Sequence, residues 1–183
     1  MTARIVLLNG VGSVGKSSTA KALQRIVERP MLHVSMDAFL DMLPPGAFGN
    51  PDYYRFETWL EAGAPVTAVR SGPVLQRLTH GMRRVVAALA ADGLDVVVDD
   101  VFWGDDLADY RAVLAPYAFH AVGLFAPLDV LEARERTRGD RDLGLARWQF
   151  AQIRPAAGYD LEIDTNEISP EEAAARIKAT FGL

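Results

Sequence analysis

The chain has 183 residues, half of them hydrophobic, and its 19 basic and 24 acidic side chains give a net charge of −5. This length and composition are typical of one soluble globular domain with its own hydrophobic core. The net negative charge, without any block of lysine and arginine, argues against a nucleic-acid partner. Because there is no cysteine, disulfides, thiolate zinc sites and cysteine nucleophiles are excluded.

The N-terminal residues and the hydropathy of the chain set an expectation for its location. Met1 is followed directly by a strand-like segment, without the pattern of a signal peptide. No window approaches the roughly 20 uninterrupted apolar residues that a membrane-spanning helix needs. We therefore expect a cytoplasmic protein with no membrane partner.

The sequence does not indicate whether the chain forms a homo-oligomer.

Apolar segments of strand length alternate with segments of helical periodicity. The predicted strands cover residues 4–9, 31–36, 94–100, 119–126 and 159–165. The predicted helices cover residues 16–28, 74–91, 105–114, 128–137, 145–153 and 170–181. This alternation predicts a three-layer α/β fold over residues 1–183, with a five-stranded parallel sheet and helices on both faces.

A glycine-rich segment, GVGSVGKSS, joins the first predicted strand to the first predicted helix. It matches the G-x-x-x-x-G-K-[ST] phosphate-binding loop at every required position and in the expected structural context. Lys16 is expected to bind the β- and γ-phosphates, and Ser17 to ligate Mg²⁺. Backbone N–H groups and the helix N-terminus would hold the phosphates. The expected nucleotide-binding residues here are Gly10, Val11, Gly12, Ser13, Val14, Gly15, Lys16, Ser17 and Ser18.

Aspartates follow the second and third predicted strands, at the edge where doubly wound sheets bind ligands. Asp99 and Asp100 end an apolar strand, as the magnesium-binding aspartate of P-loop kinases does. Neighbouring strand residues face opposite ways, so one of the two should serve the metal; Asp99 is the preferred candidate and Asp100 the alternative. Asp37 could accept the proton of an acceptor hydroxyl, or could be the N-cap of a short helix, and these roles are compatible.

Residues 44–72 interrupt the alternation of strands and helices. The segment is dense in proline and glycine, yet it also contains Phe48, Tyr53, Tyr54, Phe56 and Trp59. Disordered linkers are poor in aromatic residues, so one interpretation is an ordered excursion that lines the acceptor pocket. The other is a surface loop that packs its own aromatic side chains. Phe39, Trp103 and Trp148, like Tyr53 and Tyr54, are candidates either for the pocket wall or for the core.

Arginines follow the fourth predicted strand. Arg134, Arg138 and Arg141 would share one helix face if the helix extends that far. Placed over the nucleotide, they could neutralise charge on the transferred phosphoryl group, so residues 134–146 are a lid candidate. The alternative is a solvated charged helix. After the fifth predicted strand, Thr165 and Asn166 could border the adenine.

The ordered set of these motifs resembles the chloramphenicol phosphotransferase family of small ATP-dependent kinases. The resemblance rests on the phosphate loop, Asp37, DDVF at 99–102, R-x-x-x-RGDR at 134–141 and YD-x-E-x-DT at 159–165. It implies transfer of the ATP γ-phosphate to a hydroxyl of an antibiotic of the chloramphenicol type, with Asp37 as general base. Residues 44–72 do not follow the family's sequence closely, and Arg154-Pro155 stands where the family commonly has a histidine.

These departures leave the acceptor open. One alternative is a kinase of a nucleotide, a sugar, or an activated sugar as in zeta-type toxins; for a nucleotide, Arg55 and Arg70 are the arginines available in the acceptor region. Another is a switch protein that hydrolyses ATP without any acceptor. Since the chain lacks the Asn-Lys-x-Asp pattern that reads guanine, ATP with Mg²⁺ is the expected cofactor, and the aromatic segment favours a small-molecule acceptor with a free hydroxyl.

Overall fold

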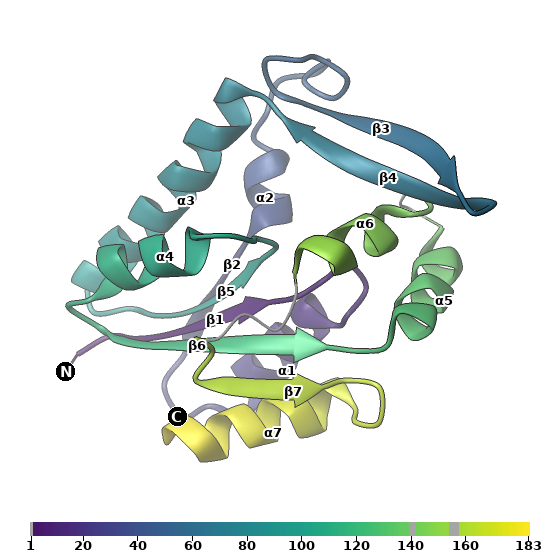
Figure 1. Cartoon of the computed structure of the whole chain (residues 1–183). Helices are drawn as coiled ribbons and strands as arrows, with labels where there is room; N and C mark the ends of the chain where they lie inside the picture. Colours follow the sequence, from purple (N-terminus) through teal and green to yellow (C-terminus); the bar gives the residue numbers. More distant parts are fainter. Residues whose placement is uncertain (1, 140–141, 154–157) are drawn as a thin grey trace.

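The computed structural model describes residues 2–139, 142–153 and 158–183, and a parallel sheet lies at its centre (Figure 1). The order across the sheet is β2, β5, β1, β6, β7, and every neighbouring pair is parallel. The strands are β1 (Arg4–Asn9), β2 (Met31–Ser35), β5 (Asp95–Asp100), β6 (Ala118–Phe125) and β7 (Leu161–Asp164). The predicted α/β fold with five parallel strands is confirmed.

Helices cover both faces of this sheet because successive strand residues point to opposite sides. Val6 and Leu8 of β1 pack in one core cluster with residues of α1, α5, α6 and α7, whereas Ile5 and Leu7 pack in a second cluster with residues of α3 and α4. The helices are α1 (Lys16–Ile26), α2 (Met36–Leu40), α3 (Pro73–Ala91), α4 (Asp106–Leu114), α5 (Leu128–Arg138), α6 (Leu145–Gln152) and α7 (Pro170–Phe181).

An antiparallel hairpin separates α2 from α3, where the sequence analysis predicts no regular element. Its strands, β3 (Tyr54–Glu61) and β4 (Ala64–Ser71), form a two-stranded sheet of their own that lies over α6 in Figure 1. The turn residues Ala62 and Gly63 both have positive φ, 49° and 79°. Tight hairpin turns of this kind favour Asn-Gly, so Ala-Gly gives only a weak sequence signal.

The hairpin is held by the segment that precedes α6. The backbone N–H of Thr67 donates to the carbonyl of Gly144 (3.1 Å), and the Thr67 hydroxyl donates to the carbonyl of Leu143 (2.8 Å). Gly144 has a φ of 92°, and a Cβ at this position would lie 2.4 Å from the carbonyl oxygen of Pro65. Only glycine can therefore approach β4 this closely.

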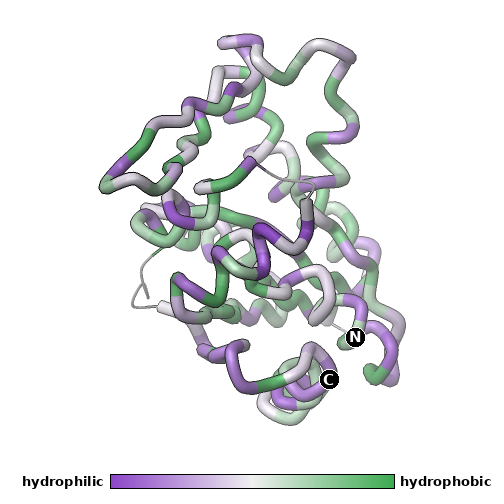
Figure 2. Tube along the Cα trace, turned by 90° about the vertical axis from the view of Figure 1, so that its right-hand side faces the viewer, coloured by the Kyte–Doolittle hydropathy of each residue, from purple (hydrophilic) through white to green (hydrophobic). Residues whose placement is uncertain are grey.

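Hydropathy varies along the whole trace, with apolar and polar stretches alternating in Figure 2. Among the residues that the structure describes, no helix combines the length and the apolar character needed to cross a membrane.

Candidate active site

The phosphate loop lies between β1 and α1, and its conformation depends on glycine. A Cβ on Gly10 would lie 2.4 Å from the carbonyl oxygen of Leu124 in β6, so this glycine allows the loop to pack against the sheet. The Lys16 ammonium donates to the carbonyls of Gly10 (2.9 Å) and Val11 (3.3 Å). These bonds place the charge of the lysine within the loop, next to the backbone N–H groups of the helix N-terminus.

A cavity of about 420 Å³ opens beside this loop and collects most of the expected donor-site residues. Its expected members are Gly12, Ser13, Val14, Gly15, Lys16, Ser17, Ser18, Asp37, Asp99, Arg134, Arg138 and Thr165. Gly10, Val11 and Asn166 are not among the lining residues, whereas Ile168, Ser169 and Pro170 at the start of α7 are. Ser169 is the N-cap of α7 and accepts from the backbone N–H of Glu172 (3.2 Å), so a helix N-terminus lies at the cavity.

Asp99 lies directly beside the phosphate loop. Its Oδ2 accepts a hydrogen bond from the Ser17 hydroxyl (2.5 Å) and lies 3.7 Å from Nε2 of His33 in β2. Burial acts to raise the pKa of Asp99, but the nearby imidazole of His33, the charge of Lys16 and the Ser17 hydroxyl together hold that pKa below its usual value. A hydroxyl and an ionised carboxylate side by side fit the oxygen ligands that Mg²⁺ prefers.

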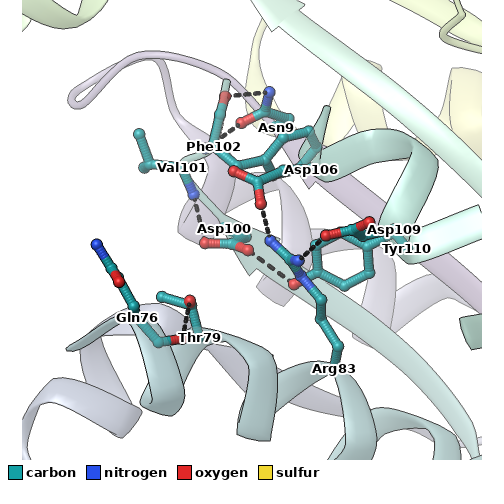
Figure 3. A network of polar contacts seen from close by, with 10 residues as sticks. All are labelled: Asn9, Gln76, Thr79, Arg83, Asp100, Val101, Phe102, Asp106, Asp109 and Tyr110. Carbon is teal, nitrogen blue, oxygen red and sulfur yellow. Dashed lines mark hydrogen bonds and ion pairs between the residues drawn. The ribbon is translucent and has the colours of Figure 1, made fainter. Parts of the chain in front are cut away.

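Asp100 lies beside Tyr110 of α4 and Arg83 of α3 (Figure 3). Its carboxylate accepts hydrogen bonds from the Tyr110 hydroxyl (2.7 Å) and from the backbone N–H of Val101 (2.7 Å). Burial raises the pKa of Asp100 above its usual value. Asp100 does not line the donor cavity, so of the two candidates only Asp99 is placed beside Ser17.

Thr165 and Arg134 connect the end of the sheet to the phosphate loop. The Thr165 hydroxyl donates to the carbonyl of Val14 (2.9 Å), and the Arg134 guanidinium donates to the carbonyl of Thr165 (2.8 Å). Arg138 also lines the cavity, at the last position of α5. The helix ends there because Gly139 adopts a left-handed conformation with φ 67°. Arg141 lies beyond this helix and outside the described residues.

Two buried polar side chains, Glu135 of α5 and Gln149 of α6, bind backbone N–H groups around the site. The buried carboxylate of Glu135 accepts from the backbone N–H groups of Gly144 (2.9 Å) and Ala146 (2.7 Å). Oε1 of the buried Gln149 accepts from the backbone N–H of Gly12 in the phosphate loop (2.7 Å). Sequence reasoning missed both side chains because neither stands in a recognisable motif.

A second cavity, of about 910 Å³, adjoins the first. It is lined by α2, the β3–β4 hairpin, α3, the segment after β5 and α6. Met36, Asp37 and Val101 line both cavities, so Asp37 lies where the two meet. The interpretation of Asp37 as a helix N-cap is wrong, because the hydroxyl of Ser35 takes that role and accepts from the N–H of Ala38 (3.2 Å).

Aromatic side chains form one part of the wall of the second cavity. Tyr54, Trp103 and Trp148 line it, and the two tryptophan rings meet edge to face with centroids 5.2 Å apart. Burial raises the pKa of the Tyr54 hydroxyl, and the carboxylates of Asp41 and Asp37 raise it further. Tyr54 therefore lies within electrostatic reach of Asp37.

Known proteins resemble this chain over almost its whole length. The family model described as "Chloramphenicol phosphotransferase-like protein" matches residues 3–182. The chain belongs to this family. A curated relative from Mycobacterium tuberculosis strain H37Rv, named "Putative O-phosphotransferase", is 31% identical over 184 residues, which cover 97% of this chain and 82% of the relative.

Solved structures of small kinases share the fold. The APS kinase CysC of Mycobacterium tuberculosis, in complex with AMPPNP and APS, has a TM-score of 0.71 at 18% identity and covers 100% of this chain and 99% of its own. A gluconokinase from Sinorhizobium meliloti 1021 has a TM-score of 0.62 at 16% identity, covering 99% and 92%. Together with the family, this fold identifies the chain as a small-molecule kinase with a nucleotide-binding phosphate loop.

Proposed function

We propose that this chain transfers the γ-phosphate of ATP to a hydroxyl group of a small molecule, with Asp37 as the general base. The observation that carries the proposal is the place of Asp37, at the junction of the cavity beside the phosphate loop and the larger cavity beneath the hairpin. An acceptor in the second cavity would present its hydroxyl to the γ-phosphate at this junction, because phosphoryl transfer needs an in-line approach.

Each of the described site residues has its own role in the proposed phosphoryl transfer. The acceptor oxygen forms a bond to the γ-phosphorus, the bond from that phosphorus to the bridging oxygen breaks, and ADP leaves. Asp37 takes the hydroxyl proton. Lys16 and the loop N–H groups hold the phosphates, while Arg138 with Arg134 offsets charge on the transferred group.

Ser17 and Asp99 are the residues that would hold Mg²⁺. Their hydrogen bond and the lowered pKa of Asp99 suit a divalent cation, which would supply charge neutralisation at the phosphates. We also propose that the chain acts in the cytoplasm, where ATP is available. Arg141 is kept as a candidate for phosphoryl stabilisation from the sequence pattern alone.

The family description makes an antibiotic of the chloramphenicol type, inactivated by phosphorylation, the first acceptor to test. The aromatic wall of the second cavity supports an acceptor with a flat apolar part. The alternative is another small acceptor, since the fold is shared with kinases whose names refer to APS and to gluconate.

Substitution of Asp37 tests the proposal. We expect Asp37→Asn to lower kcat for phosphotransfer by about a hundredfold or more, because general-base catalysis contributes that much, while AMPPNP affinity stays within about twofold. Measurement of ADP release with an acceptor panel, and of AMPPNP binding by calorimetry, checks both parts. Asp41→Asn is the matched control, since Asp41 lies one helical turn further along and lines neither cavity. Normal turnover by Asp37→Asn would remove Asp37 from the mechanism.

The same assay separates the kinase from an ATP-hydrolysing switch. ADP release that rises only when a hydroxylated acceptor is present supports phosphotransfer. ADP release that is indifferent to every acceptor supports the switch and contradicts the proposed function.

A further inference from the structure

Two arginines of the hairpin lie directly opposite each other at the second cavity. Arg55 of β3 pairs in register with Arg70 of β4, and both line the cavity. Like charges opposite each other on neighbouring strands destabilise a hairpin. Two guanidinium groups held side by side on a short sheet therefore need an anionic partner.

A single carboxylate joins the two guanidinium groups. Arg55 donates from Nε and from its terminal nitrogen to Oε1 of Glu57 (3.2 and 3.0 Å), while Nε of Arg70 donates to Oε2 (2.6 Å). Glu57 does not itself line the cavity. Two positive charges and one negative charge leave a net positive charge at this end of the cavity. The side chains are 42%, 52% and 39% exposed, so this charge is accessible to a ligand.

The acids of the cavity do not cancel this charge. Asp106 is bound by Arg83 of α3, which also donates to Asp109 (2.9 Å) and lies against the ring of Tyr110, 5.0 Å from its centroid (Figure 3). Asp100 accepts from Tyr110, as described above. Asp37 lies at the junction with the donor cavity, where the γ-phosphate would be.

Among the residues that the structure describes, the remaining lining acid, Asp142, forms no ion pair with Arg55 or Arg70. The cavity is thus polarised, with a carboxylate at its catalytic end and a pair of guanidinium groups on the hairpin.

We propose that Arg55 and Arg70 form a binding site for an anionic group of the acceptor, so that the acceptor is a hydroxylated molecule carrying a carboxylate, phosphate or sulfate. Guanidinium groups bind such anions through paired, charge-assisted hydrogen bonds. The anion takes the place of Glu57 as their partner, and the acceptor hydroxyl is then directed to the other end of the cavity. This inference rests on the proposed function, because it concerns the acceptor of that reaction. It predicts an anionic acceptor, unlike chloramphenicol, which carries no full negative charge.

The test measures anion binding at the two arginines directly. With AMPPNP and Mg²⁺ added in excess to fill the donor site, sodium sulfate and sodium acetate are titrated at constant ionic strength. The Nε–H resonances of Arg55 and Arg70 are followed by NMR and assigned with the single variants. We expect saturable shifts of both resonances. Tighter binding of sulfate indicates a phosphate or sulfate on the acceptor, whereas tighter binding of acetate indicates a carboxylate.

Three variants test whether the anion binds at Arg55 and Arg70. Arg70→Gln should weaken anion binding about tenfold, as loss of one charge-assisted bond predicts. Arg77→Gln removes one charge from an exposed position of α3 that does not line the cavity, and should leave binding unchanged. Glu57→Gln removes the competing carboxylate and should strengthen binding.

Several results would overturn the proposal: no saturable shift at either arginine, equal effects of Arg70→Gln and Arg77→Gln, or turnover of chloramphenicol with a KM that Arg70→Gln leaves unchanged. Failure of the proposed function is a separate result. It would appear as ADP release that does not change with any acceptor, whereas the anion titration reports only on Arg55 and Arg70.

Discussion

At the scale of single residues, the donor site is built from motif residues that meet side chains from distant parts of the chain. The phosphate loop is readable from the sequence because its glycines, lysine and serine stand at fixed spacing. Gln149, by contrast, contacts Gly12 across 137 positions. Such a contact depends on how α6 packs against the phosphate loop, and no local spacing encodes it.

The Asp99–Asp100 pair is a second case in which the sequence alone does not determine what a side chain contacts. The sequence predicts that the two side chains diverge, but it does not state which face of β5 covers the phosphate loop. The structure supplies this, because the Asp99 face of the strand turns toward α1 and the Asp100 face toward α3 and α4.

We expect Asp99→Asn and Asp100→Asn to have different effects. Asp99→Asn should reduce Mg²⁺-dependent phosphotransfer by about tenfold to a hundredfold, because it removes a charged oxygen at the proposed metal position. Asp100→Asn should retain activity, since it keeps an acceptor for the Val101 N–H and removes a buried charge. Magnesium titrations of ADP release compare the two, with thermal unfolding as a check on the fold. Loss of magnesium dependence in Asp100→Asn alone would reverse the assignment.

At the scale of elements, the central strands and helices could be predicted and the hairpin could not. The buried strands are continuous apolar segments, and the helices have clear periodicity and caps, such as Ser169 and Glu172 around the start of α7. The hairpin has weak alternation, an Ala-Gly turn and proline-rich flanks. It is docked through Thr67 on Leu143 and Gly144, just before α6, and sequence patterns do not describe such a contact.

Docking of the hairpin on the segment before α6 gives a prediction with a matched control. Gly139 and Gly144 both have positive φ, but only at Gly144 would a Cβ meet backbone atoms. Gly139→Ala should lower the free energy of unfolding by about 1 kcal/mol, from backbone conformation alone. Gly144→Ala should cost about 2 kcal/mol or more, because β4 must also move away.

Urea unfolding measures these free energies, and hydrogen exchange of the β4 amides shows whether Gly144→Ala releases the hairpin. Equal losses of stability in the two variants, with unchanged exchange in β4, would contradict the docking role of Gly144.

At the scale of the whole molecule, β1 lies in the middle of the sheet and its two faces belong to two separate core clusters. Successive side chains of β1 point to opposite faces, and both faces are buried. The three-layer fold was predictable because apolar strand segments alternate with helical segments along the chain. The stability of the whole chain should also depend on pH through His120 of β6, whose ring stacks on Phe181 of α7 with centroids 4.1 Å apart.

Burial lowers the pKa of His120 below its usual value, while Asp160 opposes this shift. As the pH falls through the unfolded-state pKa of about 6.5, the unfolded chain binds a proton more readily than the folded chain, so the free energy of unfolding decreases. His120→Phe keeps the ring stack and removes the titrating group. Urea unfolding at several pH values between about 5 and 8 should show a smaller loss of stability in the variant on acidification; identical curves would exclude His120 as a contributor.

The ends of the hairpin segment meet at its base, where the N–H of Gly72 donates to the carbonyl of Tyr53 (2.7 Å) and the N–H of Val74 donates to the carbonyl of Asp52 (2.9 Å). A segment whose two ends are neighbours can be exchanged without stretching the chain on either side. We therefore expect that grafting the hairpin between relatives would transfer the anion site proposed at Arg55 and Arg70, while the phosphate loop stays unchanged.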